Sequence, residues 1–128
     1  MLSDFESGAT VAVKDLAAAR NYYEGTLGFT PMEVSGGVLY PSGSGRFLVY
    51  ESGFAGSNKA TYIGFMVPED QFDGEVSALR AKGITLDTFD VNGWEGATWD
   101  DGVLMADGGK NAWFRDPDGN ILNISTMP

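Results

Sequence analysis

The chemistry open to this chain is limited by the absence of histidine and cysteine from its 128 residues. Thiol nucleophiles, disulfides and cysteine-ligated zinc are excluded, and the candidates for a general acid or base are carboxylates and tyrosines. No two candidates form a recognisable catalytic pair, so no catalytic residue is assigned and the sequence leaves open whether the chain is an enzyme. The acid–base candidates are Glu33, Tyr50, Glu51, Tyr62, Asp100 and Asp101.

Recognition of an apolar or aromatic ligand is a second chemistry that the residue types allow. Trp94 and Trp99 lie in a polar, Gly-rich connection between residues 92 and 110 and are the best candidates for stacking on a ligand. Trp113 and Phe114 follow in an apolar stretch and are expected in the core or an interface. The connection itself is interpreted either as a functional lid or as an edge ribbon that covers the core.

Charge and hydropathy limit the partners. The net charge is -10, and the acidic residues are scattered, which argues against nucleic acid or an anionic membrane surface as a partner. No apolar stretch has the length of a signal segment or a membrane span, so a cytoplasmic protein is expected. The length and the 43% hydrophobic content predict a single domain over residues 1–128.

The first half of the chain is predicted as a strand, a helix and three strands. Residues 10–14 alternate between apolar and small side chains, Asp15 is placed as an N-cap, and a helix follows over residues 16–24. Short apolar runs separated by Gly and Ser predict the strands 29–34, 38–41 and 46–51.

The second half repeats this order. Residues 62–67 alternate as a strand, Pro68 opens a helix that ends near Lys82-Gly83, and residues 84–91 are predicted as the next strand. Only residues 103–105 are interpreted as a strand inside the long connection, and Asp100-Asp101-Gly102 is interpreted as a turn. The closing strands flank a reversal at Asp116-Pro117-Asp118-Gly119-Asn120.

An internal duplication of a βαβββ unit describes this order most simply, with module one at about 8–52 and module two at about 60–126. If helices cover the apolar strand faces, the opposite faces carry small, polar and aromatic side chains that suit an apolar or aromatic ligand held by a few hydrogen bonds. The alternative is that these side chains fill the space or are covered by a partner. With the two connection tryptophans, the predicted ligand-binding residues are Thr10, Leu48, Tyr50, Tyr62, Met66, Trp94, Trp99 and Asn123.

Three motifs together give the chain its family resemblance. They are Val-Lys-Asp-Leu at residues 13–16, Tyr-Tyr-Glu-Gly-Thr-Leu-Gly-Phe at residues 22–29, and the closing hairpin from Trp113 to Ser125. Their order and spacing resemble the vicinal oxygen chelate superfamily, which includes glyoxalases, extradiol dioxygenases and bleomycin-resistance proteins. The resemblance implies an α+β fold of two tandem βαβββ modules, a cupped mixed sheet with helices on its outer face, and a homodimer.

The resemblance also locates the family's metal-ligand positions, which His and Glu occupy in its metalloenzymes. They fall here on Gly8, Tyr62, Asn123, and on Tyr50 or, with a bulge, Glu51. At most one carboxylate remains, so no metal and no other cofactor is expected, with Glu51 as a weak alternative ligand.

The prediction for function is therefore a metal-free glyoxalase/bleomycin-resistance-like protein that binds a small aromatic or drug-like molecule in a cup between its modules. By resemblance the ligand would be flat and partly cationic, and the acidic balance of the chain would attract it. One alternative is a glyoxalase- or dioxygenase-like enzyme with an atypical metal or acid–base site. The other is a protein-interaction module whose cup is filled.

Overall fold

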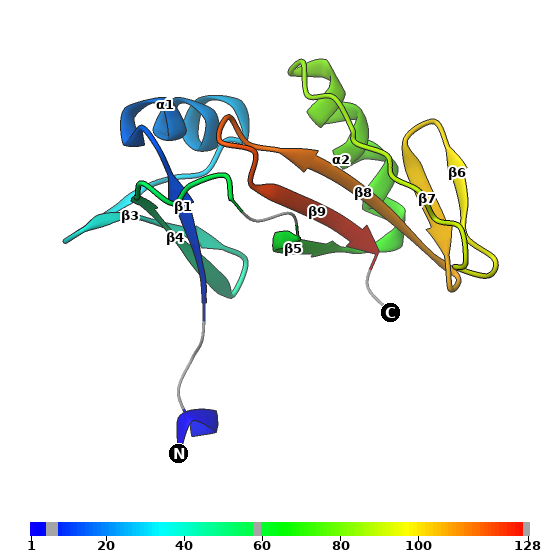
Figure 1. Cartoon of the computed structure of the whole chain (residues 1–128), viewed down its shortest axis with the longest axis horizontal. Helices are drawn as coiled ribbons and strands as arrows, with labels where there is room; N and C mark the ends of the chain where they lie inside the picture. The colour runs from blue at the N-terminus through cyan, green and yellow to red at the C-terminus, as the bar shows by residue number, and fades with distance from the viewer. Residues whose placement is uncertain (5–7, 58–59, 127–128) are drawn as a thin grey trace. The chain divides into compact units, whose positions relative to one another are not determined.

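The computed structural model describes residues 1–4, 8–57 and 60–126. The chain forms two compact units, of which unit 1 comprises Met1–Tyr62 with Pro117–Asn120, and unit 2 comprises Ile63–Asp116 with Ile121–Pro128. One sheet has four strands and the other has five (Figure 1). The α+β architecture predicted from the sequence is confirmed. Among the described residues no helix is both long and apolar enough to cross a membrane.

Unit 1 carries the four-stranded sheet, in the order β1-β4-β3-β2, with β1 parallel to β4 and the other pairs antiparallel. The strand predicted at residues 29–34 forms only from Met32, because the ring of Phe29 packs against Tyr40 and Phe47 instead of joining the sheet. The elements are η1 (Leu2–Asp4), β1 (Ala9–Val13), α1 (Leu16–Arg20), η2 (Asn21–Thr26), β2 (Met32–Val34), β3 (Gly37–Ser42) and β4 (Gly45–Glu51).

The helix of unit 1 begins as predicted and then widens. Asp15 caps it by accepting a hydrogen bond from the Ala18 amide at 3.1 Å. The predicted α-helix ends at Arg20, however, and a π-helical segment follows, closed by the Leu27 amide on the Tyr22 carbonyl at 2.9 Å. The wide turn holds the ring of Tyr23 stacked on Tyr40, and both rings are fully buried on the helix side of the sheet.

A charged network joins α1 and η2 to the sheet of unit 1. Arg20 donates to Glu24 at 2.8 Å and to Glu33 at 2.7 Å, and the Tyr40 hydroxyl donates to Glu24 at 2.9 Å. The Arg20 hydrogen bond, aided by that from Tyr40, lowers the pKa of Glu24, against the effect of burial. Burial, followed by the contact with Glu24, raises the pKa of Tyr40. The network thus stores a pH-dependent part of the stability of unit 1.

The turn of the closing hairpin belongs to unit 1, although its two strands lie in unit 2. Asn120 is 2% exposed, and its side-chain amide donates to the carbonyl of Ala12 on β1 at 2.8 Å. The Asp118 carbonyl lies so close to Gly56 that a Cβ on that glycine would be 2.6 Å from it. The turn is therefore a docked structural element, which explains a polar Asn at a buried position.

Unit 2 carries the five-stranded sheet in the order β5-β9-β8-β7-β6. Its helix packs on one face, where Phe72 and Val76 meet Ala112 and Ile124 in a buried cluster (Figure 1). Lys110 closes the edge of this cluster by pairing with Asp73 at 3.1 Å. The elements are β5 (Thr61–Val67), α2 (Glu69–Ala81), β6 (Thr98–Asp100), β7 (Val103–Ala106), β8 (Gly109–Arg115) and β9 (Ile121–Thr126).

Two strand predictions in unit 2 were wrong. Residues 84–91 form no strand; only Asp87 makes an isolated bridge, its amide donating to the Trp113 carbonyl at 2.7 Å. The sheet position beside the first part of β8 is taken by β7, and β7 pairs with β6, which the sequence interpretation left inside a loop. The β6–β7 hairpin displaces residues 84–91 from the ladder.

Candidate functional site

Unit 1 has an open sheet face opposite its aromatic core. Tyr40 and Phe47 point to the helix side, so the alternating residues Leu39, Leu48 and Tyr50 point away from it. The strand register adds Thr10 beside Leu48, and Met32 beside Leu39. The three predicted residues of this unit, Thr10, Leu48 and Tyr50, therefore share one face, and that face is largely apolar.

Glu51 does not share that face. It follows Tyr50 on β4 and pairs with Val13 in the register, which places it on the helix side. Its carboxylate accepts a hydrogen bond from the Leu16 amide at 3.3 Å, at the start of α1. A carboxylate at this position stabilises the helix terminus, which gives Glu51 a structural role.

The residues at the family's metal positions do not fit a divalent metal. Gly8 has no side chain, Asn123 offers an amide, and Glu51 is directed at a helix terminus. Within the described ranges, no three His, Cys, Asp or Glu side chains lie close enough together to hold an ion. We therefore derive no reaction step through a metal.

Unit 2 has a second sheet face on the side away from α2, which we call its open face; Met66 is exposed there, whereas Asn123 is 8% exposed and Leu104 is fully buried. Ala112 and Ile124 pack under the helix, so the alternating residues Trp113 and Asn123, which pair in the register, face the other way. On β5 a Cβ on Gly64 would lie 3.8 Å from the Asn123 side-chain oxygen, which places Gly64 on the same face. Met66 is 66% exposed and shares this side of β5, as does the half-buried Tyr62 by alternation.

Three aromatic rings gather on the open face of unit 2. The ring of Phe89 contacts Trp113 at 4.9 Å and Trp99 at 5.2 Å, both edge to face, and the two tryptophan rings are 6.1 Å apart. The Trp99 indole N–H donates to the Phe89 carbonyl at 3.0 Å, which fixes the orientation of the ring. We call Phe89, Trp99 and Trp113 the aromatic cluster. Trp94 lies 40% exposed in a turn, with no ring contact to the described residues.

Two amide side chains lie on the same face. The Asn123 side-chain nitrogen donates to the Asn111 side-chain oxygen and to the Ala112 carbonyl, both at 3.4 Å. These distances are well above the usual 2.9–3.0 Å of an N–H···O bond, so the contacts are weak. We call Asn111 and Asn123 the amide pair. It lies beside Trp113, which is paired with Asn123 across the strands.

Sequence reasoning missed several residues on these faces. In unit 2 these are Phe89, Trp113 and Asn111, because the segment of Phe89 was interpreted as a regular strand and Trp113 as core or interface. In unit 1 they are Met32, Val34 and Leu39, which share the face only through the strand register. The two Asp-Gly pairs, at residues 101–102 and 107–108, could have identified the β6 and β7 hairpins, because Asp-Gly favours two-residue turns.

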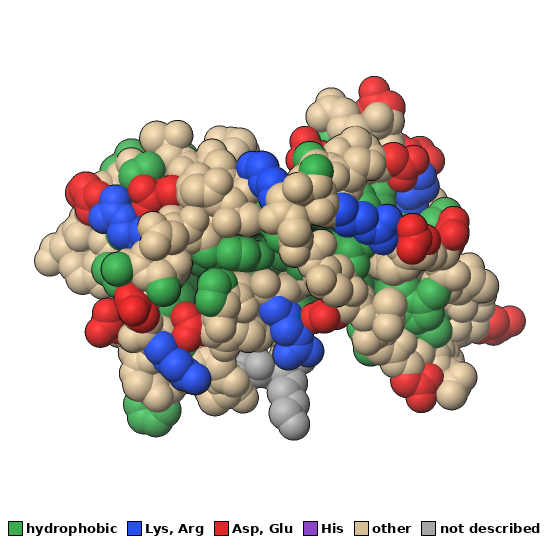
Figure 2. Space-filling model, turned by 90° about the horizontal axis from the view of Figure 1, so that it is seen from above, with side chains coloured by type: hydrophobic (Ala, Val, Ile, Leu, Met, Phe, Trp, Pro, Cys, Tyr) green, Lys and Arg blue, Asp and Glu red, His purple; other side chains and the backbone are tan. Residues whose placement is uncertain are grey.

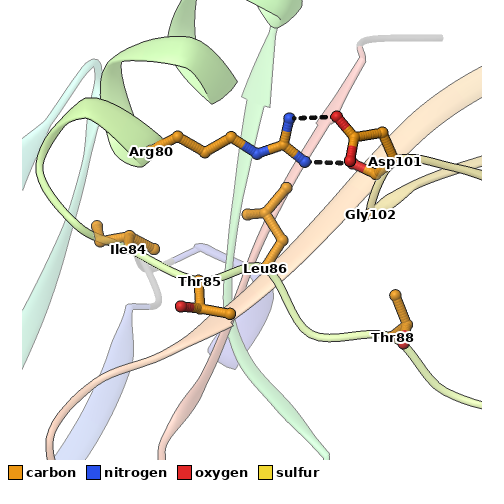
Figure 3. Close-up of a pocket in the computed structure, with 7 residues that line it drawn as sticks. All are labelled: Arg80, Ile84, Thr85, Leu86, Thr88, Asp101 and Gly102. Atoms are coloured by element: carbon orange, nitrogen blue, oxygen red, sulfur yellow. Dashed lines mark hydrogen bonds and ion pairs between the residues drawn. The ribbon is translucent and has the colours of Figure 1, made fainter.

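A separate open depression of about 490 Å³ lies beside the C-terminal end of α2. Figure 3 shows Arg80 extended across it to Asp101. The guanidinium donates to the Asp101 carboxylate at 3.1 Å and also to the Asp101 carbonyl. The depression contains none of the residues predicted to bind ligand. The charges of Arg80 and Asp101, which line it, compensate each other. Its lining is Arg80, Ile84, Thr85, Leu86, Thr88, Asp101 and Gly102.

Comparison with known proteins defines the class of the chain. Residues 8–124 match the model of the family described as "Glyoxalase/Bleomycin resistance protein/Dioxygenase superfamily". The chain belongs to this superfamily, and the resemblance drawn from the three motifs is confirmed. A search of curated proteins found no match.

Solved structures of the same fold are similar over nearly the whole chain. A glyoxalase/bleomycin resistance protein/dioxygenase from Alicyclobacillus acidocaldarius is 14% identical with a TM-score of 0.70, covering 97% of this chain and 92% of its own. The fosfomycin resistance protein FosX from Mesorhizobium loti is 14% identical with a TM-score of 0.66, covering 98% and 93%. The oxidase ChaP-H2 is 24% identical with a TM-score of 0.65, covering 97% and 94%. At these identities the likeness establishes the fold.

Proposed function

We propose that this chain is a metal-free, glyoxalase/bleomycin-resistance-like binding protein that takes a small aromatic or drug-like molecule on the open face of unit 2. One observation carries the proposal, namely that the aromatic cluster and the amide pair lie together on a sheet face that α2 does not cover. Aromatic rings with a few placed polar groups are the usual composition of small-molecule sites. The metal positions, by contrast, offer no set of ligands that would support the enzyme alternative.

The test is ligand-observed saturation-transfer NMR with planar fragments, namely indole, quinoline and 2-quinolone. Gly64→Val places a side chain beside Asn123 without removing a polar group, and the added Cβ makes only ordinary contact. We expect signal transfer to the fragments with the wild-type chain and its loss with Gly64→Val. Met105→Leu is the matched control, because Met105 pairs with Lys110 on the helix side. No transfer in the wild type, or equal transfer in both variants, would contradict the proposal.

We also propose that the chain is a homodimer in which a second copy covers the outer edge of β2. Support comes from that edge strand: Met32 and Val34 are 49% and 38% exposed on the same side, and the charge of Glu33 is paired with Arg20. Apolar edge strands without protection tend to pair with another chain. Sedimentation equilibrium should show a dimer for the wild type and a monomer for Met32→Glu/Val34→Lys; a monomeric wild type would overturn this part.

The cup between the modules, a role in antibiotic resistance and the cytoplasmic location stay predictions from the sequence. Sequestration of an antibiotic is compatible with the proposed binding, and a fosfomycin resistance protein is among the structural neighbours. The substrate of that neighbour is not transferred to this chain, because its similarity extends to the fold alone.

A further inference from the structure

We infer that the ligand of the unit 2 face is a neutral, planar heteroaromatic molecule carrying adjacent N–H and C=O groups, as in a lactam or imide. This inference rests on the proposed function and narrows its class of ligand. It departs from the partly cationic drug that the family resemblance and the acidic balance of the chain suggested.

Uncharged side chains make up most of the open face of unit 2. Along β8 and β9 the side chains that point away from α2 are amide, hydroxyl, indole and aliphatic groups, apart from Arg115 at the end of β8. Arg115 is bonded to Asp87 at 2.6 Å, so its charge is compensated beside the face. The β5, β6 and β7 residues on this side, including Met66, Trp99 and Leu104, are uncharged. The bridge to Trp113 places the Asp87 carboxylate on this face as well, but Arg115 pairs with it, so the face presents no unpaired carboxylate to a bound cation.

The acidic residues of the chain are scattered along the sequence. Figure 2 shows Asp and Glu side chains in several separate groups on the face in view, with Lys and Arg among them. The net charge of -10 accordingly creates a diffuse field. Such a field raises the association rate of cations, but it does not supply the short-range contact that sets affinity and orientation.

The amide pair has hydrogen-bonding capacity that the protein itself does not use. Each Asn side chain offers a carbonyl acceptor and an amino donor. One weak bond joins the two side chains, and among the described residues no donor reaches the Asn123 oxygen and no acceptor takes the Asn111 amino group. The contact with the Ala112 carbonyl favours this orientation of Asn123, because exchanging its oxygen and nitrogen would place two acceptor oxygens against each other. Both groups keep some access to solvent, since no buried side-chain N or O atom in the described chain lacks a partner.

A glycine and an indole ring border the amide pair. Gly64 lies next to Asn123 without a side chain, and Trp113 borders Asn123 on the other strand. A flat molecule resting here can place an aromatic ring against the aromatic cluster while its edge meets the amide pair. A molecule with a donor and an acceptor side by side satisfies both free amide groups at once. An acceptor-only ring leaves one of them unpaired, and a quaternary cation satisfies neither.

The experiment compares three probes of the same shape, namely 2-quinolone, N-methyl-2-quinolone and N-methylquinolinium, by NMR titration of the intact chain. We expect 2-quinolone to bind about 25- to 100-fold more tightly than the cation, which makes neither hydrogen bond, since each lost hydrogen bond costs roughly a factor of 5–10. N-methyl-2-quinolone, which loses one of the two bonds, should fall between them. Asn123→Leu should bring the three affinities together. Asn123→Asp keeps the shape, adds a carboxylate and should reverse the order in favour of the cation.

The outcomes separate the two proposals. If the cation binds the wild type as tightly as 2-quinolone, or if Asn123→Leu keeps the lactam preference, the inference about ligand class is wrong while the binding function stands. If none of the three probes binds the wild-type chain, the proposed function fails and the inference with it. A lactam preference that disappears in Asn123→Leu and reverses in Asn123→Asp supports both.

Discussion

At the scale of single residues, a few buried polar side chains hold the structure of unit 1. Asn120 and Tyr40 are buried and bonded to the Ala12 carbonyl and to Glu24, whereas Arg20 and Glu24 in the same network remain partly exposed. Buried polar groups of this kind contribute little net stability when paired and cost much when a partner is removed. Removing one of these hydrogen bonds should therefore lower the free energy of unfolding by a measurable amount, even though each is one contact among many.

Replacing Asn120 by Ala removes the hydrogen bond to the Ala12 carbonyl and leaves that carbonyl without its side-chain donor. We expect a loss of about 1–3 kcal/mol in the free energy of unfolding. Urea titration followed by circular dichroism measures it. Asn92→Ala is the control, because Asn92 is exposed and contributes only its backbone amide to its recorded bond with Asp90. A loss no larger than that of the control would show that the docked turn does not depend on Asn120.

The Arg20–Glu24–Tyr40 network predicts loss of stability at both ends of the pH scale. The pKa of Glu24 is lower in the folded chain than its ordinary value of 4.5, so its contribution is complete above pH 4.5 and is lost as the pH falls through the folded pKa. The pKa of Tyr40 is raised above its ordinary value of 10.0, so its contribution is complete below pH 10.0 and is lost as the pH rises.

Thermal unfolding between pH 3 and pH 11 tests this pair of signs. Glu24→Gln should flatten the acid side of the stability profile, and Tyr40→Phe should flatten the alkaline side. Tyr50→Phe, which changes an exposed tyrosine on the other face of the sheet, serves as the control. If the stability of both network variants varies with pH as it does in the wild type, the network does not contribute to the pH dependence of stability.

At the scale of elements, the β6–β7 hairpin shows how local chemistry decides the sheet. Asp101 and Gly102 have φ angles of 47° and 80°, and Asp100 pairs directly with Val103 across them. Asp107 and Gly108 repeat this arrangement before β8, with φ angles of 51° and 76°. Two tight turns within residues 100–109 bring β6, β7 and β8 together and exclude residues 84–91 from the ladder.

These two turns give a matched pair of substitutions. Gly108→Ala meets nothing within 4 Å and should cost only the left-handed backbone strain, about 1–2 kcal/mol. Gly102→Ala has the same strain, and its Cβ would also lie 3.1 Å from the Arg80 guanidinium and 3.3 Å from Leu86, which should add about 1 kcal/mol or more. Chemical unfolding of both variants checks the difference. Equal losses would mean that Arg80 and Leu86 move aside freely.

At the scale of the whole molecule, strong local signals predicted most of the elements, and the family resemblance of three motifs predicted the fold. Alternation in residues 10–14 and 62–67, the Asp15 cap and the closing turn each correspond to an observed element. The predictions that failed concern segments whose structure depends on contacts between residues distant in sequence. The π-helical turn depends on Tyr23 packing against Tyr40, and the fate of residues 84–91 depends on a hairpin that forms later in the chain.

The candidate site was predictable only in part, for the same reason. Alternation alone placed Thr10, Leu48 and Tyr50 on one face, and Asn123 on another. Phe89 and Asn111 lie on the same face as Asn123 because of the fold of the connection and the register between the strands. Neither can be predicted from the periodicity of the sequence. Glu51 fell on the opposite side from Tyr50 because no bulge interrupts β4 in the described register.

The most direct test of the central claim is a ¹⁵N–¹H NMR titration of the wild-type chain with 2-quinolone, read at the three indole N–H signals and the Asn side-chain amides. We predict that the Trp99 and Trp113 indoles and the Asn111 and Asn123 amides shift together in a saturable way. The Trp94 indole should stay in place, because its ring makes no contact with the aromatic cluster among the described residues. Shifts confined to Gly102 and its neighbours around Arg80, or no saturable shift at all, would contradict a ligand site on the open face of unit 2.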